Sequence, residues 1–206
     1  MKVVNLLAVV DQEKCRGCKT CERVCPVLAI SVVDRKAVVD ADRCRGCAAC
    51  EQRCPEYAIT MAKREQPIVV QVDVAGVDYA KIEELCRKAK LHPEQIICYC
   101  TATRAEEVAA AILQGARSPE DVSFQTGART GCKVECIQPI LRLLEAAGIE
   151  PSPPKGGWQW YGRTPTVWEI PEEVKKKYTG RGFYFDEDIK LFERVIAAPL
   201  QGRRES

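Results

Sequence analysis

Hydrophobic residues in the first third of the chain come in short β-branched runs and not at helical spacing. Val32–Val33 and Val38–Val39 flank the polar turn Asp34–Lys36, and this pattern predicts a short β-hairpin. Another β-branched run, IVVQVDV at 68–74, follows Pro67 and predicts a strand. Because Pro67 comes directly after a charged stretch, we expect a domain boundary there.

Beyond residue 78 the apolar positions follow a helical period. Positions i, i+3, i+4 and i+7 of one helix face are occupied by Ile82, Leu85, Cys86 and Ala89. Asp78 precedes them and is the candidate N-cap. We therefore expect an amphipathic helix in the connecting segment 67–95.

Three further helices are predicted between residues 103 and 148. The capping box TRAE at 103–106 opens an alanine-rich helix that ends near Gly115. Ser118 followed by Pro119 opens the next helix, since proline is favoured at the first helical position. The segment CIQPILRLLEAAG at 136–148 forms the third.

The composition changes again after residue 150. PSPPKGG at 151–157 has the composition of a linker, and all three tryptophans follow it. One helix is predicted at about Asp186–Ala198, and Lys175–Lys177 is most simply a solvated charge run. Tryptophan, tyrosine and arginine are enriched at interfaces, so the tail 157–206 is expected to dock on a partner subunit; the alternative is that it wraps back over its own domains.

The strongest internal feature is a repeat. CRGCKTCERVCP at 15–26 recurs as CRGCAACEQRCP at 44–55. The flanks repeat as well, with VVDQEKC before the first copy and VVDADRC before the second. The sequence therefore predicts a duplicated half-domain within residues 1–66.

Composition narrows the class of protein. The 206 residues include 31 Lys+Arg and 29 Asp+Glu, a balance that argues against a strongly basic nucleic-acid binder. The 13 cysteines are an odd number, and their spacing is that of metal ligands and not of a disulfide scaffold. The N-terminal segment lacks a small-residue cleavage site, and no stretch approaches the roughly 18–20 apolar residues that span a bilayer. We therefore expect a cytoplasmic metalloprotein.

Each repeat contains the ligand run C-x2-C-x2-C-x3-C-P of bacterial [4Fe–4S] ferredoxins. The segment 1–66 resembles the bacterial two-cluster ferredoxin domain, and this resemblance implies two short hairpins, two short helices and two [4Fe–4S] clusters. In such domains the fourth cysteine of each run binds the other cluster. The resemblance thus assigns cluster I to Cys15, Cys18, Cys21 and Cys54. It assigns cluster II to Cys44, Cys47, Cys50 and Cys25. The alternative is a pair of zinc knuckles.

Four more cysteines form a second constellation: Cys98, Cys100, Cys132 and Cys136. C-x-C followed at a distance by a second cysteine pair resembles the bacterioferritin-associated-ferredoxin-like [2Fe–2S] domain, over residues 96–149. The resemblance implies two loops that each deliver two thiolates to one [2Fe–2S] cluster on a small helical bundle. Here three residues separate Cys132 from Cys136 where the family has two. Mononuclear zinc or an empty site are the alternatives, because four thiolates also satisfy zinc.

Two candidate ligands remain outside these sets. Cys86 lies on the apolar face of a predicted helix and is expected to be a buried small hydrophobe; a substitute ligand or a redox thiol is the alternative. His92, the only histidine, precedes a proline in a polar connection and is expected to be an ordinary loop residue.

Together these features predict an α+β protein: a two-cluster ferredoxin fold (1–66), a connector (67–95), a helical [2Fe–2S] domain (96–149), and a linker with an aromatic-rich tail (150–206). No nucleotide-binding, nucleophile or zinc-hydrolase motif is present, so no catalytic site is expected. The predicted function is an electron-transfer subunit that relays single electrons between a partner, an FAD-dependent or metal-dependent oxidoreductase, and an electron carrier. The alternatives are an iron, copper or iron–sulfur delivery module and a redox sensor. Oxygen-sensitive clusters favour an anaerobic cytoplasm.

Overall fold

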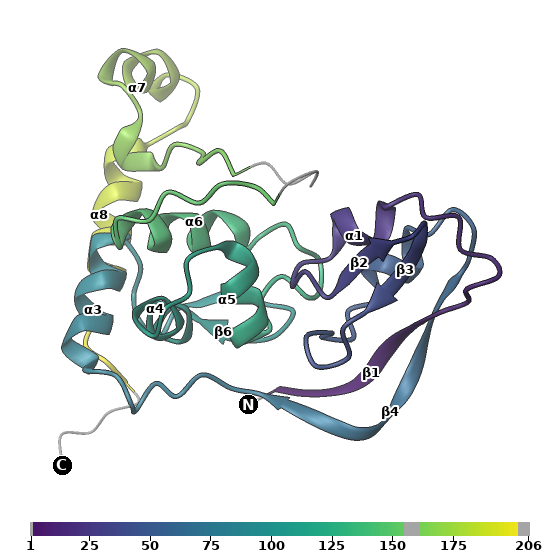
Figure 1. Cartoon of the computed structure of the whole chain (residues 1–206). Helices are drawn as coiled ribbons and strands as arrows, with labels where there is room; N and C mark the ends of the chain where they lie inside the picture. Colours follow the sequence, from purple (N-terminus) through teal and green to yellow (C-terminus); the bar gives the residue numbers. More distant parts are fainter. Residues whose placement is uncertain (1, 155–160, 202–206) are drawn as a thin grey trace.

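The computed structural model describes residues 2–154 and 161–201 (Figure 1). Helices are mixed with small two-stranded sheets, consistent with the predicted α+β class. The duplicated cysteine repeat forms one body, and the helices between residues 79 and 146 form a second body beside it. A long two-stranded ribbon runs beneath both bodies and joins them.

The ribbon consists of β1 (Lys2–Val10) and β4 (Ile59–Val70), which pair antiparallel. The pairing shifts between Val4 and Leu6, so that Asn5 opposes residues 64–67 of β4. Proline is tolerated at such a bulge because no ladder hydrogen bond is lost there.

The boundary expected at Pro67 therefore has no counterpart in the secondary structure. Strand β4 crosses this position without a break and carries the chain from the first body to the second. The strand expected at 68–74 is the last part of β4 and ends at Val70.

The two halves of the first body are related by the sequence repeat. Each half supplies one short helix, α1 (Thr20–Val24) or α2 (Ala49–Gln52). Between them lies the predicted hairpin, β2 (Ile30–Val33) and β3 (Lys36–Val39). Its two turn residues, 34 and 35, have φ of 46° and 62°, as a type I′ turn requires at both central positions.

The second body contains four helices around one apolar core. They are α3 (Tyr79–Lys88), α4 (Ala105–Leu113), α5 (Pro119–Thr126) and α6 (Ile137–Ala146). A two-stranded sheet of β5 (Ile96–Cys98) and β6 (Thr103–Arg104) lies between α3 and α4 along the chain. The core includes Ile82, Val108, Ile140 and Leu144, each fully buried.

Helix starts agree with the sequence in two cases and differ in a third. The Asp78 carboxylate accepts the Ala80 N–H, and the Ser118 hydroxyl accepts the Asp121 N–H, so both predicted N-caps are confirmed. The predicted capping box at 103–106 is wrong by one residue. The Arg104 N–H donates instead to the Glu107 carboxylate (2.9 Å), so Arg104 and not Thr103 is the N-cap of α4.

The described part of the tail begins and ends against the second body, and its middle projects away from that body (Figure 1). It contains the predicted helix, α8 (Phe185–Ile196), and two elements that the sequence did not predict, η1 (Val167–Glu169) and α7 (Glu172–Thr179). The expected solvated run 175–177 lies in α7, where Lys175 pairs with carboxylates of α7 and α8. The docking prediction also covered residues 157–160 and 202–206, which lie outside the described residues.

The end of the tail packs beside α3. Nη1 of Arg87 donates to the Ile196 carbonyl oxygen (3.0 Å), and the Gln201 N–H donates to Glu94 (2.8 Å). His92 Nε2 lies 3.1 Å from the Ala198 carbonyl oxygen, and Nδ1 accepts the Glu94 N–H. His92 is only 8% exposed. His92 lies in the loop between α3 and β5, as expected, but the tail covers it.

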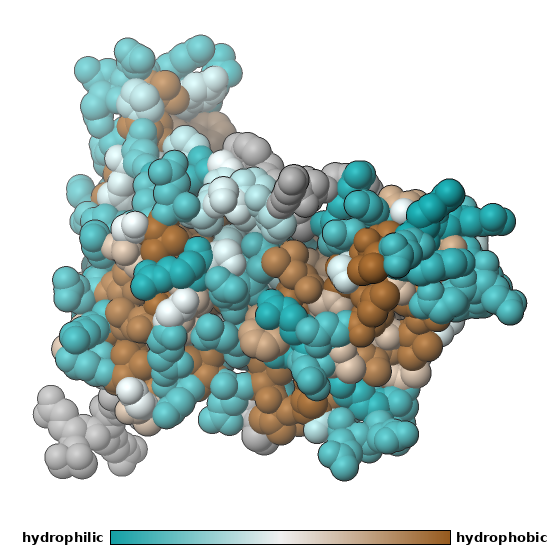
Figure 2. All heavy atoms as spheres, viewed as in Figure 1, coloured by the Kyte–Doolittle hydropathy of each residue, from teal (hydrophilic) through white to brown (hydrophobic). Residues whose placement is uncertain are grey.

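In the described part of the chain, no helix is long and apolar enough to cross a membrane. Exposed apolar side chains are nevertheless common on the ribbon and the hairpin, including Val3, Val69, Val33 and Val38. Figure 2 shows apolar side chains interspersed with polar ones over both bodies.

Candidate metal centres

One cavity of the first body collects cysteines from both repeats. Its lining includes Cys15, Cys18 and Cys21 of the first run together with Cys54, the last cysteine of the second run. Gly17 has φ +71°, and a Cβ at this position would lie 2.4 Å from the Arg35 carbonyl oxygen. The loop between Cys15 and Cys18 passes beneath the hairpin, and this close approach requires glycine at position 17.

The remaining four cysteines of the repeats form the second group. Cys25, the last cysteine of the first run, lies within electrostatic reach of Cys44 and Cys47, and Cys50 lies within reach of all three. Burial raises the pKa of Cys25 and raises that of Cys50 to about 12, so these thiols hold their protons when no positive iron is bound. Binding iron here must release those protons, because thiolates are the ligands.

Backbone N–H groups point at the sulfur atoms in the same way in both halves. The Ala29 N–H donates to Cys25 Sγ (3.2 Å) and the Ala58 N–H donates to Cys54 Sγ (3.3 Å). In each case the donor comes four residues after the last cysteine of the run. Such bonds favour the thiolate form and, in a cluster, stabilise the additional negative charge of the reduced state.

The second body brings its four cysteines to one loop region. The side chains of Cys98 and Cys136 are hydrogen-bonded to each other, and the Cys132 N–H donates to Cys100 Sγ (3.3 Å). The bond from Cys136, with a further bond from the Thr101 hydroxyl (3.1 Å), lowers the pKa of Cys98 to about 5. The same contact and burial raise the pKa of Cys136.

The extra residue between Cys132 and Cys136 does not carry Cys136 away from the site. Lys133, within this spacing, has φ +64°, so the chain turns through a left-handed residue before Cys136 caps α6. Close packing also limits the loop at Gly131, where a Cβ would lie 2.4 Å from Cys100 Cβ.

Each of the three groups brings together thiols from two segments of the chain. Among the residues that the structure describes, no three His, Cys, Asp or Glu side chains are grouped as ligands of one metal ion. Cysteines of a cluster bind different iron atoms and stand farther apart than the ligands of one zinc ion. The convergence of four thiols at each of three places is what clusters require.

Two family models match the chain. A 4Fe-4S dicluster domain matches residues 14–58, and a BFD-like [2Fe-2S] binding domain matches residues 96–146. The chain is an iron–sulfur protein with these two domains in this order. Its cofactors are two [4Fe–4S] clusters and one [2Fe–2S] cluster. The comparisons with curated proteins and with solved structures find no match.

The dicluster domain meets the BFD-like domain through its second repeat. Arg45 Nε donates to the Phe124 carbonyl oxygen of α5 (3.1 Å), and the Arg45 guanidinium lies 4.1 Å from the centroid of the Phe124 ring. Arg43 lies over the same ring at 4.5 Å. Arg16, the equivalent of Arg45 in the first repeat, is exposed. Nothing in the sequence distinguishes the two arginines, since both occur in the letters CRGC.

Two further contacts join the domains. Lys2 Nζ forms an ion pair with Glu107 (2.8 Å), and Lys133 Nζ lies 3.5 Å from the carbonyl oxygen of Val24. Val24 directly precedes Cys25, and Lys133 directly follows Cys132. The cysteine loop of the BFD-like domain therefore faces the cysteines of the second group.

Cys86 lies outside both matched segments. It is fully buried in α3, and burial raises its pKa to about 12. The expectation of a buried apolar cysteine is thus confirmed.

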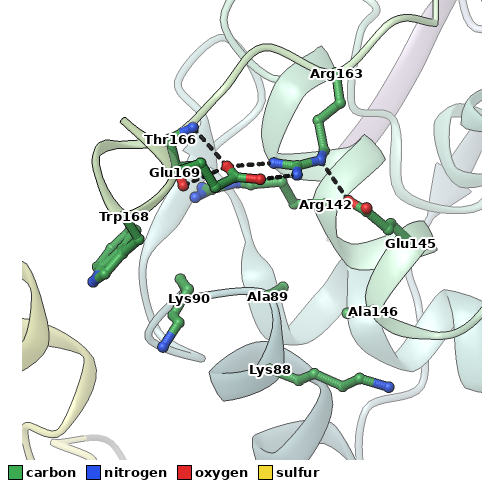
Figure 3. A pocket seen from close by; sticks show the side chains of 10 residues that line it. All are labelled: Lys88, Ala89, Lys90, Arg142, Glu145, Ala146, Arg163, Thr166, Trp168 and Glu169. Atoms are coloured by element: carbon green, nitrogen blue, oxygen red, sulfur yellow. Dashed lines mark hydrogen bonds and ion pairs between the residues drawn. The ribbon is translucent and has the colours of Figure 1, made fainter. Parts of the chain in front are cut away.

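The tail is anchored on the BFD-like domain by Arg163. Its guanidinium lies between Glu145 of α6 (Nε–Oε2 2.5 Å) and Glu169 of η1, which it contacts with two nitrogens (Figure 3). The Arg163 hydrogen bonds, with those from Thr166, lower the pKa of Glu169 to about 2. A cavity of about 340 Å³ remains between this anchor, α3 and α6, with Trp168 at its edge.

Proposed function

We propose that this chain relays single electrons within a larger oxidoreductase, in the order cluster I, cluster II, [2Fe–2S]. The outer partners are an FAD-dependent or metal-dependent oxidoreductase and an electron carrier. Iron–sulfur domains of these two types indicate electron transfer.

The ligand sets of the proposal follow the groups of cysteines described above. Cluster I is held by Cys15, Cys18, Cys21 and Cys54. Cluster II is held by Cys44, Cys47, Cys50 and Cys25. The [2Fe–2S] cluster is held by Cys98, Cys100, Cys132 and Cys136.

The Arg45–Phe124 contact carries the proposed order. Arg45 lies in the loop between the first two ligands of cluster II, so the BFD-like domain covers that loop. The Lys133 contact beside Cys25 places the [2Fe–2S] loop on the same side. Arg16 and Cys18, in the corresponding loop of cluster I, are exposed and have no such cover. Cluster II is therefore the inner centre, and cluster I and [2Fe–2S] are the two ends.

The chain's own residues prepare each site for electron transfer. When bound, each cluster supplies a one-electron couple. The N–H donors of Ala29 and Ala58 point at ligand sulfurs and hold them in place, and Ala37 N–H does the same for Cys15 Sγ (3.4 Å). Burial of Cys21, Cys25, Cys44 and Cys50 keeps water away from half of the eight proposed [4Fe–4S] ligand sulfurs. Preformed donors reduce the rearrangement that a change of charge would otherwise demand.

Electron paramagnetic resonance of the fully reduced, anaerobically purified protein tests the order. We expect magnetic interaction between [2Fe–2S] and one [4Fe–4S] cluster. Cys25→Ser should abolish this interaction together with cluster II, whereas its pseudo-symmetric control Cys54→Ser should remove cluster I and leave the interaction in place. If Cys54→Ser abolished the interaction instead, the order would be reversed.

The surface that we propose for partner binding differs from the docking tail that the sequence predicts. The tail packs on its own chain through Arg163 and Ile196, yet α7 and α8 leave Phe183 and Tyr184 about half exposed (53% and 55%). Aromatic side chains exposed in this way fit a protein interface. Anaerobic purification from the source cells should therefore yield a flavoprotein or metalloenzyme at fixed stoichiometry. A double variant, Phe183→Ser with Tyr184→Ser, should release it, and Lys176→Ser should not.

One observation favours a second candidate function, cluster or metal delivery. Cys100 and Cys132 are exposed, so half of the proposed [2Fe–2S] ligands are accessible to an acceptor. Incubating the loaded protein with a cluster-free acceptor ferredoxin separates the two functions. A relay protein retains its [2Fe–2S] absorbance in this experiment, and a delivery module loses it to the acceptor.

A further inference from the structure

A buried ion pair lies behind the [2Fe–2S] cysteines. Arg129 Nη1 and Glu120 Oε1 are 3.0 Å apart, and the two side chains are only 6% and 2% exposed. Glu120 belongs to the first turn of α5, and Arg129 belongs to the loop that leads to Cys132. Charges this deeply buried interact strongly with their surroundings, since little water screens them.

Arg129 is next to the ligands themselves. Its backbone N–H lowers the pKa of Cys98, and its N–H and guanidinium act in the same direction on the pKa of Cys136. Its φ of +64° is a left-handed conformation that a non-glycine residue rarely adopts. The loop thus places both the amide and the charge of Arg129 beside the cluster site.

The tail reaches this ion pair from outside the matched domain. The hydroxyl of Tyr161 donates to the same Glu120 oxygen that contacts Arg129, and the Tyr161 ring lies 5.9 Å from the Arg129 guanidinium. Burial and the Glu120 contact raise the pKa of Tyr161, so it remains a neutral donor.

The same tail segment also holds the start of α6. Gln138 Nε2 donates to the Gly162 carbonyl oxygen (3.2 Å), and its Oε1 accepts the Thr164 N–H (2.9 Å). Gln138 is two residues after Cys136. Residues 161–164 therefore contact α5 and α6, and through them reach the loop and the helix that carry Cys132 and Cys136.

We propose that the tail segment 161–164 is a clamp that sets the reduction potential of the [2Fe–2S] cluster by fixing the charge of Arg129 beside its ligands. Tyr161 and Glu120 are positioning residues, because they act through Arg129. Reduction adds one electron and no proton, which makes the four-thiolate cluster more negative by one charge. A nearby cation favours that reduced state, and a nearby carboxylate opposes it.

The test is the [2Fe–2S] potential in anaerobic titrations followed by electron paramagnetic resonance, with the [4Fe–4S] potentials as internal references. Arg129→Gln should lower the [2Fe–2S] potential, and Arg129→Lys should restore most of it. Glu120→Gln should raise it, because the cation then lacks its counter-charge. Tyr161→Phe should lower it by a smaller amount, since the carboxylate loses a donor. The [4Fe–4S] potentials should not move.

The expected shifts of the [2Fe–2S] potential have opposite signs in these variants, which separates an electrostatic role from a structural one. A loosened fold would shift the potential of all variants in one direction. Tyr161→Phe keeps the ring and is the decisive variant should the buried charge variants fail to fold. Glu169→Gln is the matched control: it weakens the other tail anchor without touching Glu120, and should leave the potential unchanged. An unshifted Tyr161→Phe, or an equal shift in Glu169→Gln, would overturn the clamp.

The inference rests on the ligand set of the proposed function, and the two can fail separately. A wild-type protein without a [2Fe–2S] signal would overturn the ligand set and the clamp together. A wild-type protein that shows the signal, with variants that do not shift it, would overturn the clamp alone.

Discussion

The guanidinium of Arg45 stacks on the ring of Phe124 at 4.1 Å and donates to the Phe124 carbonyl oxygen, so that one arginine of the dicluster domain binds both the side chain and the backbone of the BFD-like domain. Burial lowers the pKa of Arg45, with the charges of Arg64 and Arg43 adding to this effect. The second repeat is thereby committed to an internal interface, while the first repeat keeps the equivalent Arg16 exposed.

Replacing Arg45 should separate the two domains. Arg45→Ala removes a cation–π contact and a hydrogen bond to a backbone oxygen, together about 1–3 kcal/mol of domain association. We expect faster hydrogen exchange at Phe124 and faster proteolysis in the connecting residues 71–78. Arg16→Ala is the matched control, since it alters the same motif position without an interdomain contact. Equal effects of the two variants would contradict this role of Arg45.

Adding one methyl group at Gly131 should prevent [2Fe–2S] binding. The Cβ of Gly131→Ala would lie 2.4 Å from Cys100 Cβ and 2.7 Å from its sulfur, so Cys100 must move. We expect iron and sulfide content to fall by one [2Fe–2S] cluster while both [4Fe–4S] signals remain. Gly180→Ala, where nothing lies within 4 Å of the new Cβ, should leave all three clusters intact.

Cys86 should resist alkylation at a pH where ordinary thiols react. Its pKa is raised from 9.0 to about 12 by burial, so the folded protein binds this proton more tightly than the unfolded chain does. The resulting stabilisation is complete below pH 9 and is lost as the pH rises toward 12. Mass spectrometry after iodoacetamide treatment at pH 9 should find Cys86 unmodified in the folded protein and modified after denaturation. Cys86→Ala should leave the iron content unchanged; loss of a cluster would identify Cys86 as a ligand.

His92→Ala should release the end of the tail. The imidazole bonds the Ala198 carbonyl oxygen and the Glu94 N–H, and losing two largely buried hydrogen bonds costs about 1–3 kcal/mol. Hydrogen exchange in α8 should accelerate, while α5 and α6 remain protected. Lys176→Ala, at an exposed position of α7, should not change the exchange of α8. Unchanged exchange in His92→Ala would show that other contacts hold the tail.

Short-range patterns predicted α3 to α6, α8 and the candidate ligands but missed η1 and α7, and they could not predict the long-range contacts. The N-caps Asp78 and Ser118 could be predicted because capping depends on residues two or three positions apart. The contact of His92 with Ala198 could not be predicted, because the two residues are 106 positions apart in the chain. The continuation of β4 through Pro67 could not be predicted, because the bulge that accommodates this proline depends on Asn5 of another strand.

The sequence by itself predicted three groups of cysteines, because the ligand runs have short spacings and the resemblance to known domains implies how the runs combine. It also determined that the second run duplicates the first. Only the tertiary structure decided how the duplicates differ: Arg45 meets Phe124, and Arg16 meets no partner domain. It also decided that Tyr161 of the tail reaches Glu120 beside the [2Fe–2S] site. The physical reason is the same in both cases. The contacting residues are far apart in the chain, so only folding brings them together.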